Sequence, residues 1–188
     1  MNILALTGSR NPEGKTGLCV KALFDGAGKD HQCEQIFLTA KKIERCIQCD
    51  FNGWGKCRTE GICTIEDDFH SIVEKIRQAD AIVFATPVYF SDISESMKSF
   101  LDRLRRITRH QAGKTGIEGK PAIGICVAGG GGGGAVMCCF FLERILTGCG
   151  FVVVDMIPCR RQNLQHKSQI LGLTGKWFVE HITTEGYK

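Results

Sequence analysis

The sequence predicts an α/β fold, a three-layer α/β/α sandwich around a five-stranded parallel sheet, and three observations support this. Short apolar runs alternate with amphipathic helical stretches from one end of the chain to the other. Two runs, 81–85 and 122–128, are continuously apolar, as in strands that helices cover on both faces. The 188 residues are enough for one domain, 1–188, with a continuous core. Helical connections return the chain to the same end of the sheet, so the strands are expected to be parallel.

The first half of the chain supplies two strands, two helices and a long connection. An apolar run at 1–6 ends in a glycine-containing turn and leads into a helical pattern over 14–24. A second strand fits 34–38, and the cysteine-bearing segment 39–63 after it is irregular. Apolar residues then recur at helical spacing over 69–76, which predicts a helix with one buried face.

The second half repeats the alternation. The apolar run 81–85 predicts a strand that ends at Pro87. A helical stripe follows, and its members are Met97, Phe100, Leu101, Leu104 and Ile107. The remaining elements are a strand over 122–128, a helix over 136–146, a strand over 151–157 and a weaker helical pattern over 170–182.

Composition and charge exclude several classes of protein. The 24 basic and 20 acidic residues give a net charge of +4, which is too small and too dispersed to indicate nucleic-acid binding. The densest basic group is interpreted as a solvated helix end, and it consists of Arg103, Arg105, Arg106, Arg109, His110 and Lys114. The longest uncharged stretch, 121–142, contains six consecutive glycines, so no membrane segment is expected.

The N-terminus and the cysteines indicate where the protein is found. The chain opens without the basic and long apolar regions of a secretory signal, so a cytoplasmic location is expected. Eleven cysteines are an odd number, and they are spread among apolar segments rather than arranged as a disulfide framework. In a reducing compartment they are expected to be free thiols, unless a group of them binds metal.

The first of three candidate ligand loops follows the first strand, at the sheet edge where such folds bind ligands. The segment Gly8–Gly17 offers hydroxyl groups, cationic side chains and the N–H groups that open a helix, as a phosphate requires. Its spacing matches neither a P-loop nor a dinucleotide-binding turn. The segment therefore indicates a mononucleotide phosphate, and the alternative is a plain turn of small residues.

The second and third loops follow the strands at 81–85 and 122–128. In the segment 86–91, Pro87 fixes the backbone and two aromatic residues offer flat apolar surface, although such residues also serve as core packing. The glycine run 129–134 lets a ligand approach the backbone closely, or forms a mobile surface loop. Because all three loops fall at one edge of the predicted sheet, their position favours a shared site.

Two motifs carry a resemblance to a known family. The segments are 80–90, Asp-Ala-Ile-Val-Phe-Ala-Thr-Pro-Val-Tyr-Phe, and 97–103, Met-Lys-Ser-Phe-Leu-Asp-Arg. With the first loop, they resemble the NADPH-dependent FMN reductase and iron–sulfur flavoprotein family of flavodoxin-like proteins over residues 1 to about 157. The resemblance implies a flavodoxin-like strand order of 2-1-3-4-5.

The resemblance also implies bound FMN, with NAD(P)H as the co-substrate. Family members often have Pro-Arg after the first serine of the phosphate loop, where this chain has Arg10-Asn11. The implied phosphate loop comprises Ser9, Arg10, Asn11, Lys15, Thr16 and Gly17. The implied isoalloxazine contacts are Thr86, Pro87, Val88, Tyr89 and Phe90 on one edge, with Gly129, Gly130 and Gly131 on the other.

Four cysteines in the long loop have the spacing C-x2-C-x7-C-x5-C, and they are Cys46, Cys49, Cys57 and Cys63. Convergent thiolates are what a soft metal or a cluster needs. The iron–sulfur flavoproteins show a tighter C-x2-C-x2-C, and here Asn52 stands where their third cysteine would be. A [4Fe–4S] cluster, a structural zinc ion and unmetallated thiols all remain open.

The sequence and the resemblance together predict an FMN-dependent oxidoreductase that passes electrons from NAD(P)H to a flavin, quinone or protein acceptor. No catalytic acid or base is expected, because the flavin carries the chemistry. The alternative is an iron–sulfur flavoprotein electron carrier that ferredoxin feeds. A phosphoacceptor regulatory domain is disfavoured, because its acidic strand ends are replaced by Thr7, Gly8 and Thr86. Related flavoproteins pair subunits over the flavin, which implies a homodimer or homotetramer.

Overall fold

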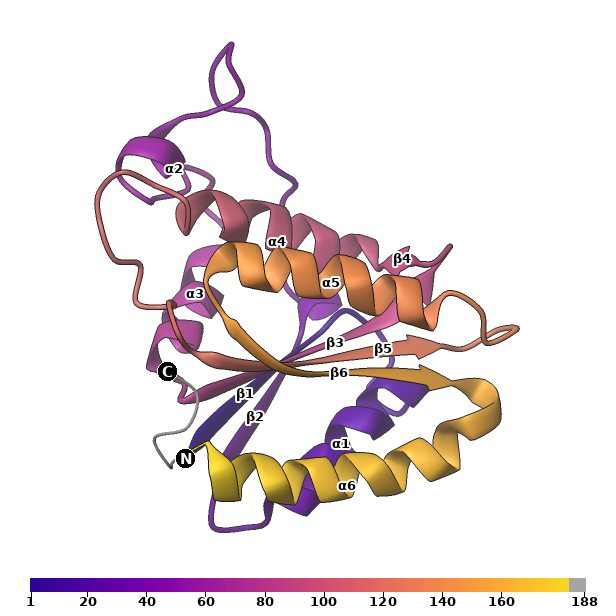
Figure 1. Cartoon of the computed structure of the whole chain (residues 1–188). Coiled ribbons are helices and arrows are strands. Elements are labelled where there is room, and N and C mark those ends of the chain that lie inside the picture. The colour runs from indigo at the N-terminus through magenta and orange to yellow at the C-terminus, as the bar shows by residue number, and fades with distance from the viewer. Residues whose placement is uncertain (183–188) are drawn as a thin grey trace.

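The computed structural model, which describes residues 1–182, contains a central sheet with helices on both faces (Figure 1). The last six residues of the predicted domain lie outside the described part of the chain. The strands are β1 (Asn2–Thr7), β2 (Gln32–Phe37), β3 (Ala81–Tyr89), β4 (Asp92–Ile93), β5 (Pro121–Ala128) and β6 (Val152–Arg160). The helices are α1 (Lys15–Ala27), α2 (Lys56–Thr59), α3 (Phe69–Gln78), α4 (Glu95–Ile107), α5 (Ala135–Cys149) and α6 (Leu164–His181), with short 3₁₀ turns at Leu38–Ala40 and Arg161–Asn163.

Five parallel strands form the sheet in the order β2-β1-β3-β5-β6, which confirms the predicted flavodoxin-like arrangement. The two-residue strand β4 pairs antiparallel with the end of β3 and was not predicted. The prediction that Pro87 ends its strand was wrong, because β3 continues to Tyr89 and Pro87 pairs with Val127. β1 has already ended at Thr7, which pairs with Ala85, so Pro87 lies where one side of β3 has no parallel neighbour and a proline is tolerated.

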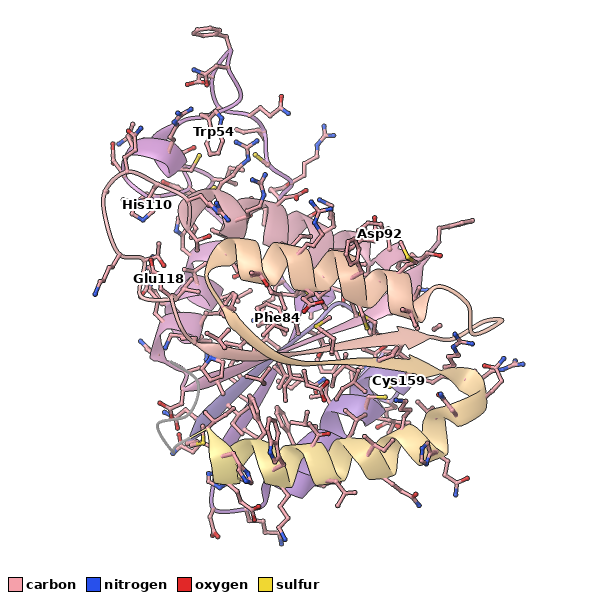
Figure 2. The ribbon with its side chains drawn as sticks, viewed as in Figure 1. Trp54, Phe84, Asp92, His110, Glu118 and Cys159 are labelled. Atoms are coloured by element: carbon pink, nitrogen blue, oxygen red, sulfur yellow. The ribbon has the colours of Figure 1, made fainter. Side chains whose placement is uncertain are left out.

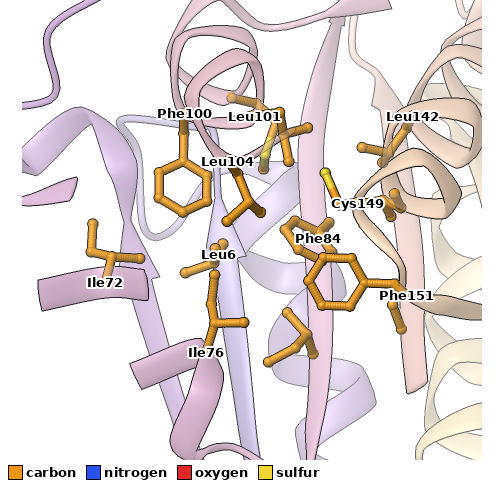
Figure 3. Close-up of a cluster of buried hydrophobic side chains, with 14 of the residues drawn as sticks. Leu6, Ile72, Ile76, Phe84, Phe100, Leu101, Leu104, Leu142, Cys149 and Phe151 are labelled. Atoms are coloured by element: carbon orange, nitrogen blue, oxygen red, sulfur yellow. The ribbon is translucent and has the colours of Figure 1, made fainter. Parts of the chain in front are cut away.

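The strand residues alternate between two cores. Leu4 and Leu6 face α3, α4 and α5, whereas Ile3 and Ala5 face α1 and α6. Figure 3 shows the first core, in which Leu6 and Phe84 of the sheet pack against side chains from the three covering helices. Fully buried side chains fill both cores, so the sheet is a rigid support for the loops at its edge.

Helix α4 connects two regions of the molecule. It begins beside β4, at the edge of the sheet where β3 and β5 end, and its other end lies beside α2 and the cysteine-bearing loop (Figure 1). Its predicted apolar stripe is confirmed, since the side chains from Met97 to Ile107 in that stripe are all buried. Within residues 1–182, no helix is both long enough and apolar enough to cross a membrane.

Candidate functional site

The first loop is fastened to the sheet and to α4 through Gly8. The N–H of Gly8 donates to the carbonyl of Ala85 (2.8 Å), and its own carbonyl accepts from the Ser96 hydroxyl (3.1 Å). A Cβ at Gly8 would stand 2.3 Å from Oγ of Ser94, so only glycine fits between the end of β1 and the start of α4. The loop therefore leaves the sheet at a fixed point.

Ser9 and Asn11 shape the turn that follows. The Ser9 hydroxyl accepts from the N–H of Asn11 (3.3 Å), and Oδ1 of Asn11 accepts from the N–H of Glu13 (3.0 Å). A third bond runs from the N–H of Gly14 to the carbonyl of Asn11 (3.0 Å). These contacts fold the loop back so that it delivers the chain to the start of α1.

The N-terminus of α1 is open. No side chain among the described residues caps it, and its first turn contains no acidic residue. Lys15 is exposed there, whereas Thr16 and Gly17 are buried. Uncapped N–H groups and the positive end of a helix dipole favour an anion, so this end of α1 suits the phosphate that the sequence predicts.

The second loop begins with a buried hydrogen-bond network around Thr86. Its hydroxyl accepts from the N–H of Ser94 (2.9 Å) and lies 2.9 Å from the carbonyl of Pro87 and 3.1 Å from Oγ of Ser94. The Ser94 side chain in turn caps α4 by accepting from the N–H of Met97. Thr86 is completely buried, so its side chain organises the loop from beneath.

Tyr89 and Phe90 lie at the tip of the β3–β4 hairpin. Phe90 and Ser91 occupy the two turn positions with φ of 49° and 68°, left-handed values that cost energy for residues other than glycine. The side chain of Tyr89 is 52% exposed and that of Phe90 is fully exposed. Neither ring therefore serves as core packing, which answers the question that the sequence left open.

The glycine run is held at Gly131 and Gly134, whereas its first residues border open space. The carbonyl of Gly131 accepts from Nε2 of Gln162 (3.0 Å), and a Cβ at Gly134 would stand 2.6 Å from Oγ of Ser91. Among the described residues, and apart from the chain neighbours, no atom lies within 4 Å of the place where a Cβ would stand at Gly129, Gly130 or Gly131. The run thus touches the hairpin of the second loop at Gly134, while the glycines that the sequence singled out border open space.

The structure thus brings all three predicted loops to the carboxyl ends of β1, β3 and β5, at the edge of the sheet near Asp92 (Figures 1 and 2). The first loop contacts the strand residue just before the second loop, through Gly8 and Ala85, and the second loop contacts the third through Ser91 and Gly134.

The four loop cysteines come together in a second region. Cys46, Cys49, Cys57 and Cys63 all line one small cavity of about 20 Å³. Cys57 reaches it from α2 and is buried, whereas the Cys49 thiol lies 3.4 Å from the Thr64 hydroxyl. Within residues 1–182, no three His, Cys, Asp or Glu side chains are close enough together to bind a metal ion as they stand.

Arg103 of α4 lies under this cavity and corrects one prediction. It was grouped with a solvated helix end, but only 1% of its side chain is exposed, and it pairs with Asp67, whose side chain is completely buried. The sequence signal was present, because Arg103 falls between Phe100 and Leu104 on the buried stripe. Sequence reasoning missed Arg103 and Asp67 as a pair because they are far apart in the chain.

The pKa of Asp67 is lowered by its surroundings. Burial alone would raise this pKa, but hydrogen bonds from Arg103 and from the N–H groups of Glu44 (2.7 Å) and Phe69 (3.1 Å) favour the carboxylate and prevail. Asp67 is thus an anion at neutral pH, and its negative charge balances the positive charge of the guanidinium beside it.

Six of the remaining seven cysteines belong to the two cores, whereas Cys33 is exposed. Cys126, Cys138, Cys139 and Cys149 are all buried. Burial is the largest cause that raises the pKa of the Cys149 thiol, to about 11. Neighbouring Cys138 and Cys139 and burial together raise the pKa of Cys126. Such thiols are inert and pack as small apolar side chains.

Comparison with known proteins gives a consistent result. The sequence profile of the NADPH-dependent FMN reductase family matches residues 1–157. An iron–sulfur flavoprotein of Methanocaldococcus jannaschii is 32% identical over 125 residues, which cover 66% of this chain and 62% of that protein. A putative NAD(P)H-dependent FMN-containing oxidoreductase of Bacillus subtilis is 39% identical over 109 residues, 58% of this chain and 55% of that protein.

Solved structures share the fold. An NAD(P)H:quinone oxidoreductase from Methanothermobacter marburgensis superposes with a TM-score of 0.70 at 22% identity, covering 96% of this chain and 98% of that one. An archaeal flavodoxin gives a TM-score of 0.57 at 15% identity, covering 96% of this chain and all of that one. At these identities the likeness shows the fold alone. The family match, in contrast, covers most of the sequence, and the chain belongs to the NADPH-dependent FMN reductase family.

Proposed function

We propose that the protein is an FMN-dependent oxidoreductase that transfers electrons from NAD(P)H through bound FMN to a flavin, quinone or protein acceptor. Family membership supports this, as does the meeting of the three loops at one sheet edge. The chain spans about three fifths of the length of the M. jannaschii relative, 62%, so substrate and acceptor are part of the proposal.

The open N-terminus of α1 carries the proposal. A phosphate there would accept hydrogen bonds from the N–H groups of the first turn, with the Ser9 and Thr16 hydroxyls and the Lys15 ammonium group beside it. Asn11 holds the loop through its side chain and its carbonyl, and we infer that it shapes the turn beside the phosphate. Arg10 is exposed and available as a second cation.

The second and third loops would hold the isoalloxazine ring. Tyr89 and Phe90 supply uncovered aromatic surface on a hairpin that is fixed by its pairing with β4, and Pro87 and Val88 precede them on β3. The glycines 129–131 leave room for a ring at the opposite side. When bound, FMN accepts a hydride from a nicotinamide and passes electrons on. The chain's task is to orient the ring and leave one face accessible.

A second role is favoured by the four cysteines. All four residues line one cavity, and thiols are the donors that a soft metal ion or an iron–sulfur cluster takes. A volume of about 20 Å³ is close to that of one water-sized sphere, and no three metal-ligating side chains of the described residues stand close enough to hold an ion, so loading of this site requires the loop to rearrange. We propose that this site, when loaded, lets the protein act as an electron carrier between ferredoxin and the flavin.

Apolar surface beside the proposed flavin site supports assembly into a homodimer or homotetramer. Phe90 is exposed there, and so are Val136, Met137 and Phe140 on the first half of α5. Large apolar side chains that share an exposed face are typical of contact surfaces. A second subunit would cover them and enclose the ring.

All eleven cysteines are free thiols in the structure. Free thiols persist in a reducing compartment, so we propose that the protein works in the cytoplasm.

The experiment that tests the function combines a spectrum with turnover. Anaerobically purified full-length chain should show flavin absorption after incubation with FMN and gel filtration, and it should oxidise NADPH or NADH when a quinone or free FMN is supplied. Flavin binding without turnover of either nucleotide would favour the carrier role. A protein that retains no flavin would contradict both roles.

A further inference from the structure

A basic cavity lies between the cysteine-bearing loop and the outer face of α4. Its volume is about 260 Å³, and the loop contributes Arg45, Cys46 and Gln48 to its lining. The helix contributes residues from the face opposite its buried stripe, and these are Lys98, Ser99, Asp102, Arg105 and Arg106. No residue of the three loops at the sheet edge lines this cavity, so the proposed function leaves it without a ligand.

The lining carries an unbalanced positive charge. Arg45, Lys98, Arg105 and Arg106 are cations, and Asp102 is the sole carboxylate among the lining residues. That carboxylate is already paired, because Nζ of Lys98 donates to its Oδ1 at 2.5 Å. Three guanidinium charges around one cavity repel one another, and a bound anion relieves the repulsion.

The donors that such an anion needs are available. In the described part of the chain, the side chains of Arg45 and Arg105 neither donate a hydrogen bond nor form an ion pair, and the Ser99 hydroxyl has no partner. Arg106 is engaged, because its Nη1 donates to the carbonyl of Gly53. Guanidinium groups present forked N–H donors that match the oxygens of a phosphate, so Arg45 and Arg105 favour a phosphate over a simple anion.

The backbone beside the cavity is strained. Gln48 has a φ of 53°, a left-handed value that costs energy for a residue other than glycine. Strain of this kind is concentrated at ligand-binding segments. It therefore agrees with a binding role for this part of the loop.

The size of the cavity indicates which part of a ligand it takes. Sites that enclose a whole drug-sized ligand measure about 300–1,000 Å³, and this cavity is smaller, at about 260 Å³. It suits a phosphate with its adjoining sugar. The rest of the ligand would then lie outside the cavity.

Helix α4 leads from the proposed flavin site to this cavity. Its N-cap Ser94 belongs to the network under the second loop. Lys98 lies four residues further along and Arg105 eleven, about 6 and 17 Å at 1.5 Å per residue. A dinucleotide with its nicotinamide at the flavin extends its adenosine end away from the ring. The 2′-phosphate that distinguishes NADPH from NADH is at that end, and arginine is the residue that typically accepts it.

Resting on the proposed flavin function, we propose that the basic cavity binds the 2′-phosphate of NADPH, with Arg45 and Arg105 as its charged partners and Ser99 as a neutral donor. The protein is then selective for NADPH over NADH. Arg45 and Arg105 determine this specificity and take no part in the chemistry, because they lie away from the reacting atoms.

Arg109 provides a matched control. It follows α4 and is exposed, but it does not line the cavity, and its Nε donates to the carbonyl of Gly148 at 2.7 Å. Arg109→Gln removes the same charge as Arg105→Gln from a neighbouring position.

The first test measures binding without turnover. Full-length chain, with and without saturating FMN, is titrated in phosphate-free buffer with 2′,5′-ADP, 5′-AMP and inorganic phosphate. We expect 2′,5′-ADP to bind at least about tenfold more tightly than the other two. Arg105→Gln should remove this advantage, whereas Arg109→Gln should keep it.

Three results of this titration would overturn the proposal. They are equal affinity for 2′,5′-ADP and 5′-AMP, an advantage of 2′,5′-ADP that survives in Arg105→Gln, and inorganic phosphate that binds as tightly as 2′,5′-ADP. The last result would assign the cavity to free phosphate and not to the co-substrate.

The second test measures specificity in turnover. In Arg45→Gln and in Arg105→Gln, the ratio of kcat/KM for NADPH to kcat/KM for NADH should fall about tenfold through a higher KM for NADPH. Equal use of the two nucleotides by the wild-type chain would contradict this inference alone. A chain that binds no FMN would contradict the proposed function, and the titration with 2′,5′-ADP would still decide whether the cavity takes a 2′-phosphate.

Discussion

The two candidate regions are built in opposite ways. At the sheet edge, strand pairing and backbone contacts fix the loops, and glycines at positions such as 8 and 134 allow the segments to approach closely. The cysteine loop, 44–67, contains only the single short helix α2, and side chains hold it. Arg103 contacts its base, and Arg58 and Arg106 both contact the Trp54 ring further out. Strand order and backbone contacts position the loops at the sheet edge, whereas individual side chains position the cysteine loop.

Helix α4 joins the two regions. Its N-cap Ser94 belongs to the network under the second loop, and Arg103 lies nine residues along it, about 14 Å at 1.5 Å per residue. The proposed flavin site at one end and the cysteine-lined cavity at the other therefore lie along one helix. The comparison predicts that substitutions at the sheet edge change flavin binding alone. Substitution of Arg103 should also lower the free energy of unfolding.

The largest effect is expected from breaking the buried ion pair. Arg103→Met leaves the Asp67 carboxylate buried without its partner, and such losses cost about 3–5 kcal/mol in the free energy of unfolding. Urea denaturation measures the loss. The double variant Arg103→Met with Asp67→Leu should recover most of it, because no unpaired charge remains. A loss below about 1 kcal/mol in the single variant would show that the pair does not hold the loop.

The next effect comes from crowding the first loop. A Cβ at Gly17 would stand 1.9 Å from the carbonyl oxygen of Pro12, so Gly17→Ala must displace the proposed phosphate loop, at a cost of roughly 1–3 kcal/mol in FMN binding. Fluorescence titration with FMN gives the change. Gly148→Ala is the matched control, since its Cβ meets only Nη2 of Arg109, at 3.8 Å, and alanine favours the helix. Equal FMN affinity in the two variants would refute the placement of the phosphate.

Acid should weaken the contacts that the Asp67 carboxylate makes at the cysteine loop. The pKa of Asp67 is lowered in the folded protein, so its contribution to stability is complete above the unfolded-state value of about 3.9 and is lost as the pH falls through the lower folded value. Glu118, whose pKa is lowered to about 2 chiefly by backbone hydrogen bonds that outweigh burial, loses its contribution in the same direction. Urea unfolding at pH 7, 5 and 3 should show the decline below pH 5. Asp67→Asn should flatten it, and an equally steep decline in that variant would contradict the assignment.

Charge reversal at the open N-terminus of α1 should weaken the binding of FMN but not the binding of riboflavin. Lys15→Glu places a carboxylate at the proposed phosphate and should weaken FMN binding about tenfold while leaving riboflavin binding unchanged. Lys21→Glu reverses a charge further along the same helix, where Lys21 pairs with Asp25 on the exposed surface, and should alter neither. Parallel losses for both flavins would show that the effect does not act on phosphate.

The smallest effect is expected at Trp54. The guanidinium groups of Arg58, at 5.4 Å, and Arg106, at 4.7 Å, both contact its ring, and such contacts are worth about 0.5–1 kcal/mol each when exposed. Trp54→Leu should speed amide hydrogen exchange within 46–63 and leave FMN affinity unchanged. Slower or unchanged exchange there would mean that the stack does not order the loop.

The sequence predicted most of the first region and little of the second. Runs such as 81–85 are apolar because both faces are covered, so the strands, their order and the edge with the three loops could be expected before any coordinates. The β3–β4 hairpin could not, since Phe90 and Ser91 adopt left-handed conformations that their side chains disfavour. The Arg103–Asp67 pair was not predicted, because its two residues are far apart in the sequence. The charge of Arg103 alone suggested that its side chain is exposed to solvent. Convergence of the cysteines likewise depends on how a loop without periodicity folds.

The central claim is that the open end of α1 binds the phosphate of a flavin mononucleotide held by the three loops. Parallel equilibrium titrations of the full-length chain with FMN and with riboflavin test it most directly. The account predicts that FMN binds and coelutes with the protein on gel filtration, with an affinity at least about tenfold above that of riboflavin. Failure to bind FMN, or equal affinity for the two flavins, would contradict it.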